Sequence, residues 1–144
     1  MAAEWVLPHE PLTVHADALL RGYTEGRVSL VVPDLFFAEF GNVLWKAEQS
    51  GRCDARVIDT AIAKMLAHEF RSFKTSPLLG AALQIVRAYR QPVYDSIYIA
   101  LAVETNSEMI SSDQKLVNAA HGESPMAGGG SLAGAIASQD MQPL

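Results

Sequence analysis

The chain has 144 residues, of which 49% are hydrophobic and 19% charged, a composition typical of one globular domain rather than of a disordered chain. The formal net charge of -5 excludes an overall basic surface, so any chemistry on nucleic acid would need a metal ion or a local patch of Lys and Arg. The single cysteine, Cys53, excludes an internal disulfide, and the four histidines form no H-x-x-x-H pair for zinc. Because the sequence has neither an apolar run of about 18 residues nor a signal peptide, we expect a cytoplasmic protein that does not enter a membrane.

Apolar periodicity predicts three helices and one strand in the first half of the chain. A helix over residues 12–23 should end at Gly26, and the β-branched run 28–32 predicts a buried strand. A second helix is expected over residues 34–49, and a third should begin at the N-cap Asp54 and end near Leu66. The predicted buried stripe of the second helix is Phe36, Phe40, Val43 and Ala47.

The second half of the chain predicts further helices with weaker strands between them. Residues 71–76 form a poor strand or a loop, and Pro77 opens a helix that extends to Tyr89. After Pro92, residues 94–103 are apolar almost all round, which predicts a buried helix. We then expect a strand over residues 108–111 and a short helix over residues 113–120. Helices that alternate with short strands indicate an α/β fold with a parallel sheet.

Three carboxylates stand out by their positions. Glu39 lies within an apolar helix, where a carboxylate is costly unless it is solvated, hydrogen-bonded or bound to a cation. Asp95 begins the buried helix, and Asp113 follows the last predicted strand. Each acid also has a simpler interpretation, because Glu39 can be a solvated border residue and the two aspartates can be helix caps.

The predicted topology brings these three acids to the same edge of the sheet. Strand ends and helix N-termini gather at one edge of a parallel sheet, where ligands bind. We therefore expect Glu39, Asp95 and Asp113 to converge there. Clustered carboxylates repel one another unless a cation neutralises them, and oxygen ligands suit Mg²⁺ or Mn²⁺. Such ions activate water and stabilise the charge of a phosphodiester transition state.

The segments around these acids resemble PIN domains of the VapC toxin type. Residues 33–44, with Glu39, resemble the family segment that carries its second acid. Residues 93–102, with Asp95, resemble the segment of the third acid through the pattern Tyr-Asp-x-x-Tyr-x-Ala-Leu-Ala. Residues 110–116, with Asp113, resemble the Thr-x-Asp segment of the fourth acid, with Ser111 in place of threonine.

The resemblance implies an α/β/α sandwich with a parallel sheet and a metal-dependent endoribonuclease. It assigns Glu39, Asp95 and Asp113 both catalytic and metal-binding roles with Mg²⁺ or Mn²⁺. It also implies an RNA substrate, a small VapB-type antitoxin as partner, and a homodimer.

The chain departs from the family pattern at its N-terminus. The family opens with a strand that ends in Asp-Ala-Ser, whereas Glu4 to Glu10 resembles the end of the helix that follows this strand. We therefore expect residues 1–121 to form a PIN-like domain without its first strand and first acid, followed by a Gly-rich, loosely ordered tail over residues 122–144. A truncated gene product, a start codon assigned too late and a decayed copy all account for this departure.

The departure leaves two functional hypotheses. A third hypothesis is an unrelated helical domain whose acids only cap helices. The first is a ribonuclease of the VapC type, impaired by the missing acid. The alternative is a catalytically inactive PIN-like module that binds an antitoxin or dimerises. Tyr94 and Tyr98 are expected in the core rather than stacked on RNA bases, and Arg87, Arg90 and Lys115 are expected as solvated charges rather than phosphate ligands.

Overall fold

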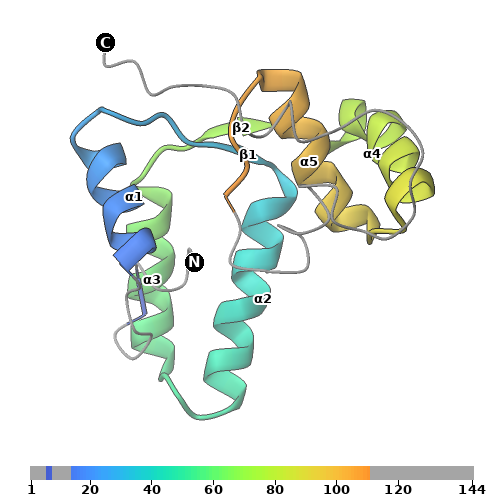
Figure 1. Cartoon of the computed structure of the whole chain (residues 1–144). Helices are drawn as coiled ribbons and strands as arrows, with labels where there is room; N and C mark the ends of the chain where they lie inside the picture. The colour runs from blue at the N-terminus through green and yellow to red at the C-terminus, as the bar shows by residue number, and fades with distance from the viewer. Residues whose placement is uncertain (1–5, 8–13, 111–144) are drawn as a thin grey trace. The chain divides into compact units, whose positions relative to one another are not determined.

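The computed structural model describes residues 6–7 and 14–110. The chain divides between Ser72 and Phe73 into two units, each of which is described by itself. The helix expected over residues 113–120 and the tail expected over residues 122–144 lie outside the described residues. In chain order the elements are α1 (Val14–Thr24), β1 (Val31–Pro33), α2 (Leu35–Gln49), α3 (Ala55–Leu66), β2 (Arg71–Phe73), α4 (Thr75–Tyr89) and α5 (Val93–Thr105) (Figure 1).

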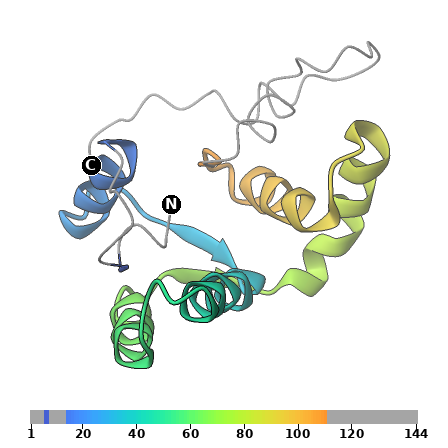
Figure 2. The same ribbon diagram turned by 90° about the horizontal axis from the view of Figure 1, so that it is seen from below.

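A two-stranded parallel sheet and a helical hairpin form the centre of the first unit. Strand β1 pairs with β2, and the chain between them forms α2 and α3, which lie side by side (Figures 1 and 2). The turn between the helices places Gly51 at φ 70°, a conformation that glycine adopts without steric cost. The α/β class and the parallel sheet predicted from the sequence are confirmed.

The contact between α2 and α3 builds the apolar core of this unit. Leu44 and Met65 are almost completely buried, at 1% exposure each. The predicted stripe of α2 is wrong at Val43, which is 40% exposed. At about 100° per residue, Val43 lies roughly 100° around the helix from the buried Leu44, so it falls at the edge of the face that Leu44 shares with Phe40 and Ala47. The buried core residues of this unit are Val6, Leu7, Phe40, Leu44, Ala47, Ile58, Ala61, Met65 and Phe70.

The strand predicted over residues 28–32 begins later, at Val31. Helix α1 ends at Thr24 and Gly26 follows it at φ 71°, as expected of a glycine at a helix C-terminus, but the hydrogen bonds that close the helix end continue past the glycine. The backbone N–H groups of Arg27 and Val28 both donate to the carbonyl oxygen of Gly22, at 2.8 and 3.1 Å. Because the backbone N–H of Val28 donates to Gly22 at the end of α1, it is not available for pairing in a sheet.

Aromatic side chains connect α1 and α2 to the segment before β2. The Tyr23 hydroxyl donates a hydrogen bond to the backbone carbonyl oxygen of His68. The ring of Phe70 lies 5.3 Å from that of Tyr23 and 6.0 Å from that of Phe36, measured between centroids. These contacts hold the segment that leads into β2 against α1 and α2, where β2 pairs with β1, so the segment predicted as a poor strand or a loop becomes a strand.

The predicted start of α3 is confirmed. The Asp54 carboxylate accepts a hydrogen bond of 3.0 Å from the backbone N–H of Val57. An N-cap of this kind satisfies one of the four N–H groups that a helix leaves without partners at its start.

In the second unit α4 and α5 pack against each other. Helix α4 begins at Thr75 rather than at Pro77, so the proline is its third residue. Proline is tolerated there because the N–H groups of the first turn have no partner within the helix. Helix α5 is buried as predicted in its middle, whereas Tyr94 and Val103 at the ends of the predicted range are exposed. Its buried residues are Ser96, Ile97, Ile99, Ala100, Leu101 and Ala102.

The strand predicted over residues 108–111 is wrong for its described part. Residues 108–110 have no regular secondary structure, and Ser111 lies outside the described residues. Glutamate is depleted in strands, and Ile110 is the one β-branched residue of the three described, so local preference for a strand is weak.

Two neighbouring residues of α3 test the core. Met65→Ala should lower the free energy of unfolding by about 2 to 5 kcal/mol, because the side chain is 1% exposed and its loss leaves a cavity. Leu66→Ala is the matched control, since Leu66 is 60% exposed and the change should cost less than about 1 kcal/mol. Urea unfolding followed by circular dichroism measures both. Equal losses for the two variants would contradict the assigned face of α3.

Candidate functional site

Glu39 lies one turn into α2, directly after the strand β1. It is the fifth residue of the helix, and its side chain is exposed. The next residue, Phe40, is buried, so Glu39 stands at the border of the apolar face. This position matches the sequence prediction of a border acid at the strand end, where a carboxylate is available to a cation or to solvent.

Asp95 is the third residue of α5, and its side chain is half-buried. The N-cap of the helix is Pro92, which makes no side-chain cap, so the interpretation of Asp95 as the N-cap is wrong. A carboxylate in the first turn still interacts favourably with the positive end of the helix dipole. Asp95 is therefore held at a helix N-terminus, as the sequence predicted, but inside the helix.

The convergence of the three acids stays a prediction. Glu39 belongs to the first unit and Asp95 to the second, while Asp113 lies outside the described residues. Within residues 6–7 and 14–110, no three His, Cys, Asp or Glu side chains form a group that could hold a metal ion.

A buried hydroxyl next to Asp95 was not singled out by the sequence analysis. Ser96 has 0% exposure, and its Oγ has no hydrogen-bond partner among the described residues. In the sequence, Ser96 could have been noticed as a polar residue in a largely apolar segment, but the adjacent Asp95 was the more obvious candidate.

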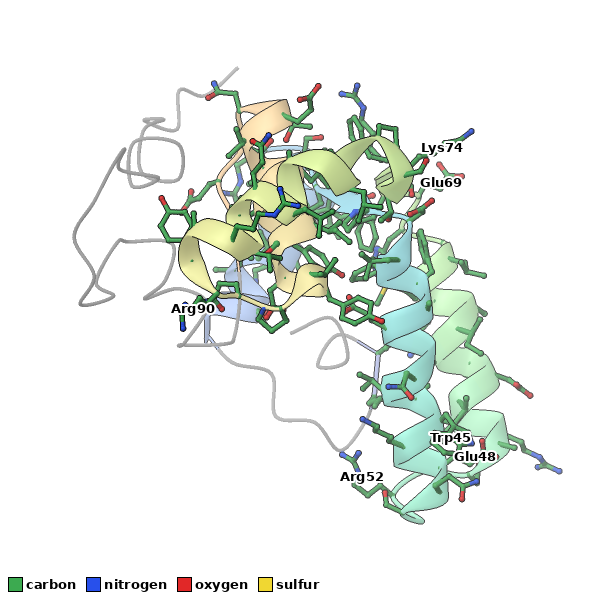
Figure 3. The ribbon with its side chains drawn as sticks, turned by 90° about the vertical axis from the view of Figure 1, so that its right-hand side faces the viewer. Trp45, Glu48, Arg52, Glu69, Lys74 and Arg90 are labelled. Atoms are coloured by element: carbon green, nitrogen blue, oxygen red, sulfur yellow. The ribbon has the colours of Figure 1, made fainter. Side chains whose placement is uncertain are left out.

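The aromatic and basic residues considered for RNA differ in exposure. Tyr94 is 66% exposed, so its assignment to the core is wrong, whereas Tyr98 is half-buried. Tyr94 lies in the first turn of α5, before the buried residues, which begin at Ser96. Arg87 and Arg90 are exposed at the end of α4, as expected for solvated charges, and Lys115 lies outside the described residues. Arg90 is labelled in Figure 3.

Comparison with protein-family models decides the family. The model described as PIN domain matches residues 4–122, which is most of the chain. The chain belongs to the PIN-domain family. No curated protein sequence matches it at the significance required of a relative.

Membership of the PIN family gives the site a general chemical setting. PIN domains are generally nucleases, and they usually use divalent metal ions. The matched range includes Glu39, Asp95 and Asp113. Among the described residues, no helix has both the length and the apolar character needed to cross a membrane.

Proposed function

We propose that this PIN domain is a metal-dependent endoribonuclease of the VapC toxin type. Glu39, Asp95 and Asp113 would hold Mg²⁺ or Mn²⁺, and RNA would be the substrate. The observation that carries the proposal is the family match over residues 4–122, a range that includes all three acids. The described positions of Glu39, after a strand, and Asp95, in the first turn of a helix, support it.

The charges of the chain explain why a cation belongs to this proposal. The net charge is -5, and three carboxylates at one site would repel the phosphates of RNA. A bound divalent cation supplies positive charge for the phosphodiester transition state. The half-buried Asp95 would fix the position of a ligand oxygen, whereas the exposed Glu39 leaves room for substrate beside it.

RNA cleavage tests the proposed activity. Purified chain with Mg²⁺ or Mn²⁺ should cleave RNA, and Asp95→Asn should reduce the rate roughly 100-fold or more, because it removes a charged ligand oxygen. Glu104→Gln removes an exposed carboxylate from the same helix and should leave the rate unchanged. Fluorescence of a quenched RNA oligonucleotide, with and without EDTA, measures these rates. Cleavage by Asp95→Asn at the wild-type rate, or none by the wild type, would contradict the proposal.

A second candidate function is a catalytically inactive PIN module that binds a VapB-type antitoxin or a second copy of itself. Large apolar side chains that remain exposed on α2 and α3 favour it, since such side chains are common where proteins associate. Trp45, toward the end of α2 that leads into the turn, is 55% exposed (Figure 3). The exposed apolar residues of this hairpin are Val43, Trp45, Ile62 and Leu66.

Association with an antitoxin tests this second candidate. A small VapB-type protein encoded beside the chain should co-purify with it, and Trp45→Lys should weaken binding at least about tenfold, because a buried aromatic side chain at an interface contributes strongly. Ala88→Lys is the control, since it adds the same charge to an exposed position of α4, outside the hairpin. Affinity is measured by calorimetry, and oligomeric state by light scattering. Equal affinities for wild type and Trp45→Lys would remove this hairpin from the interface.

A further inference from the structure

We propose that one side of the α2–α3 hairpin is a docking surface for an amphipathic helix of a partner protein, with Lys or Arg beside the apolar face of that helix. We call this surface the Trp45 face, and its apolar residues are Trp45, Ile62 and Leu66. All of them belong to the first unit. The inference deepens the second candidate function and rests on its assignment of an interface to this hairpin.

Helix geometry places the three apolar residues on the same side of the hairpin. Leu44 of α2 and Met65 of α3 are buried where the two helices meet. Trp45 and Leu66 directly follow them in sequence and are exposed. Each step along a right-handed helix turns about 100° in the same sense, so in two antiparallel helices the residues that follow the contact lie on the same side. Ile62 is four positions before Leu66 and shares its face of α3.

The charged residues that share this face are acidic. Glu48 is three positions after Trp45, and Asp59 is three positions before Ile62, so each lies on the face of its apolar neighbour. Both carboxylates are exposed, and Figure 3 shows Glu48 next to Trp45 near the turn of the hairpin. The basic residues of the two helices are not three or four positions from any of the three apolar residues; they are Lys46, Arg56 and Lys64.

This charge selects the partner. Lys or Arg beside the apolar face of a bound helix complements the two exposed carboxylates, and complementary charges at the rim of an interface favour one partner over others. A symmetric pair formed through the same face would instead bring the acids of one copy toward the acids of the other. The charges therefore favour a different, basic helix over a second copy of the chain.

Gly41 gives a bound helix room to approach closely. It is four positions before Trp45 on α2, it is exposed, and a Cβ added to it would meet nothing within 4 Å. Its φ is not positive, so alanine would fit there. Glycine within a helix destabilises it relative to alanine, whereas close approach of another backbone is a use to which glycine is suited. A helix laid in a groove between two others makes such an approach.

The Trp45 face does not include Glu39. The two residues are six positions apart in α2, which places their side chains about 120° from each other around the helix. Docking on this face and use of Glu39 are therefore separate events, and binding can be measured without RNA or metal ion.

Two synthetic helical peptides test the charge of the partner on the full chain. Both carry leucine on one face, and beside that face one carries lysine and the other glutamate. Fluorescence anisotropy at about 0.15 M salt should show the lysine peptide bound at least about tenfold more tightly. Glu48→Lys should weaken its binding at least about fivefold, because like charges then meet. Glu104→Lys makes the same change at an exposed position of α5 and should leave binding within about twofold.

Gly41→Ala tests the close approach. Without peptide, Tm should rise by about 3 °C, because alanine stabilises a helix relative to glycine. Affinity for the lysine peptide should weaken about fivefold, because the added methyl group reduces the fit of the two surfaces. Gly80→Ala is the matched control, since Gly80 is an exposed glycine of α4 whose added Cβ would also meet nothing within 4 Å. It should raise Tm without weakening the binding.

The outcomes separate this inference from the proposed functions. Equal affinities for the two peptides, binding of neither, or equal losses in Glu48→Lys and Glu104→Lys would overturn it. A dimer in light scattering that Gly41→Ala disrupts would overturn it in favour of a second copy. An antitoxin that binds through Trp45 while neither peptide binds would overturn this inference alone and support the second candidate function. RNA cleavage decides the first candidate function without bearing on the peptides.

Discussion

The apolar contact between α2 and α3 is the interaction on which the first unit depends. Leu44 and Met65 are almost fully buried where the two helices meet, and removal of such side chains from water is the main favourable term in folding. Because β1 leads into α2 and β2 follows α3, the hairpin returns the chain to the strand that it left. The sheet, and with it the strand end that precedes Glu39, therefore exists because the hairpin closes.

The sequence predicts the elements whose causes are local. Asp54 caps α3 through a bond to a residue three positions away, and Gly26 ends α1 because glycine accepts a positive φ. Prediction from the sequence is wrong where residues outside an element determine whether that element forms. Val28 has the side chain of a strand residue, yet its N–H serves the end of α1. Residues 71–73 look weak in sequence, but pairing with β1 makes them a strand.

The same distinction between local and long-range causes applies to the candidate site. Sequence position alone placed Glu39 after a strand and Asp95 at a helix start, and both placements are confirmed. Whether those carboxylates share a cation depends on how distant elements pack, which no local pattern determines. Ser96 shows the complementary failure, because its sequence neighbours do not reveal that its hydroxyl is buried without a partner among the described residues. The unsatisfied hydroxyl is evident only from the burial and the hydrogen bonding of the folded chain.

The central claim is that three carboxylates of this PIN domain meet at one divalent cation. A crystal structure of the full chain soaked in Mn²⁺, with the ion located by its anomalous signal, tests this most directly. The account predicts one Mn²⁺ bound by oxygens of Glu39, Asp95 and Asp113, at close to the roughly 2.1 Å typical of Mg²⁺ sites. Three carboxylates on separate faces of the molecule, or Mn²⁺ bound elsewhere, would contradict it.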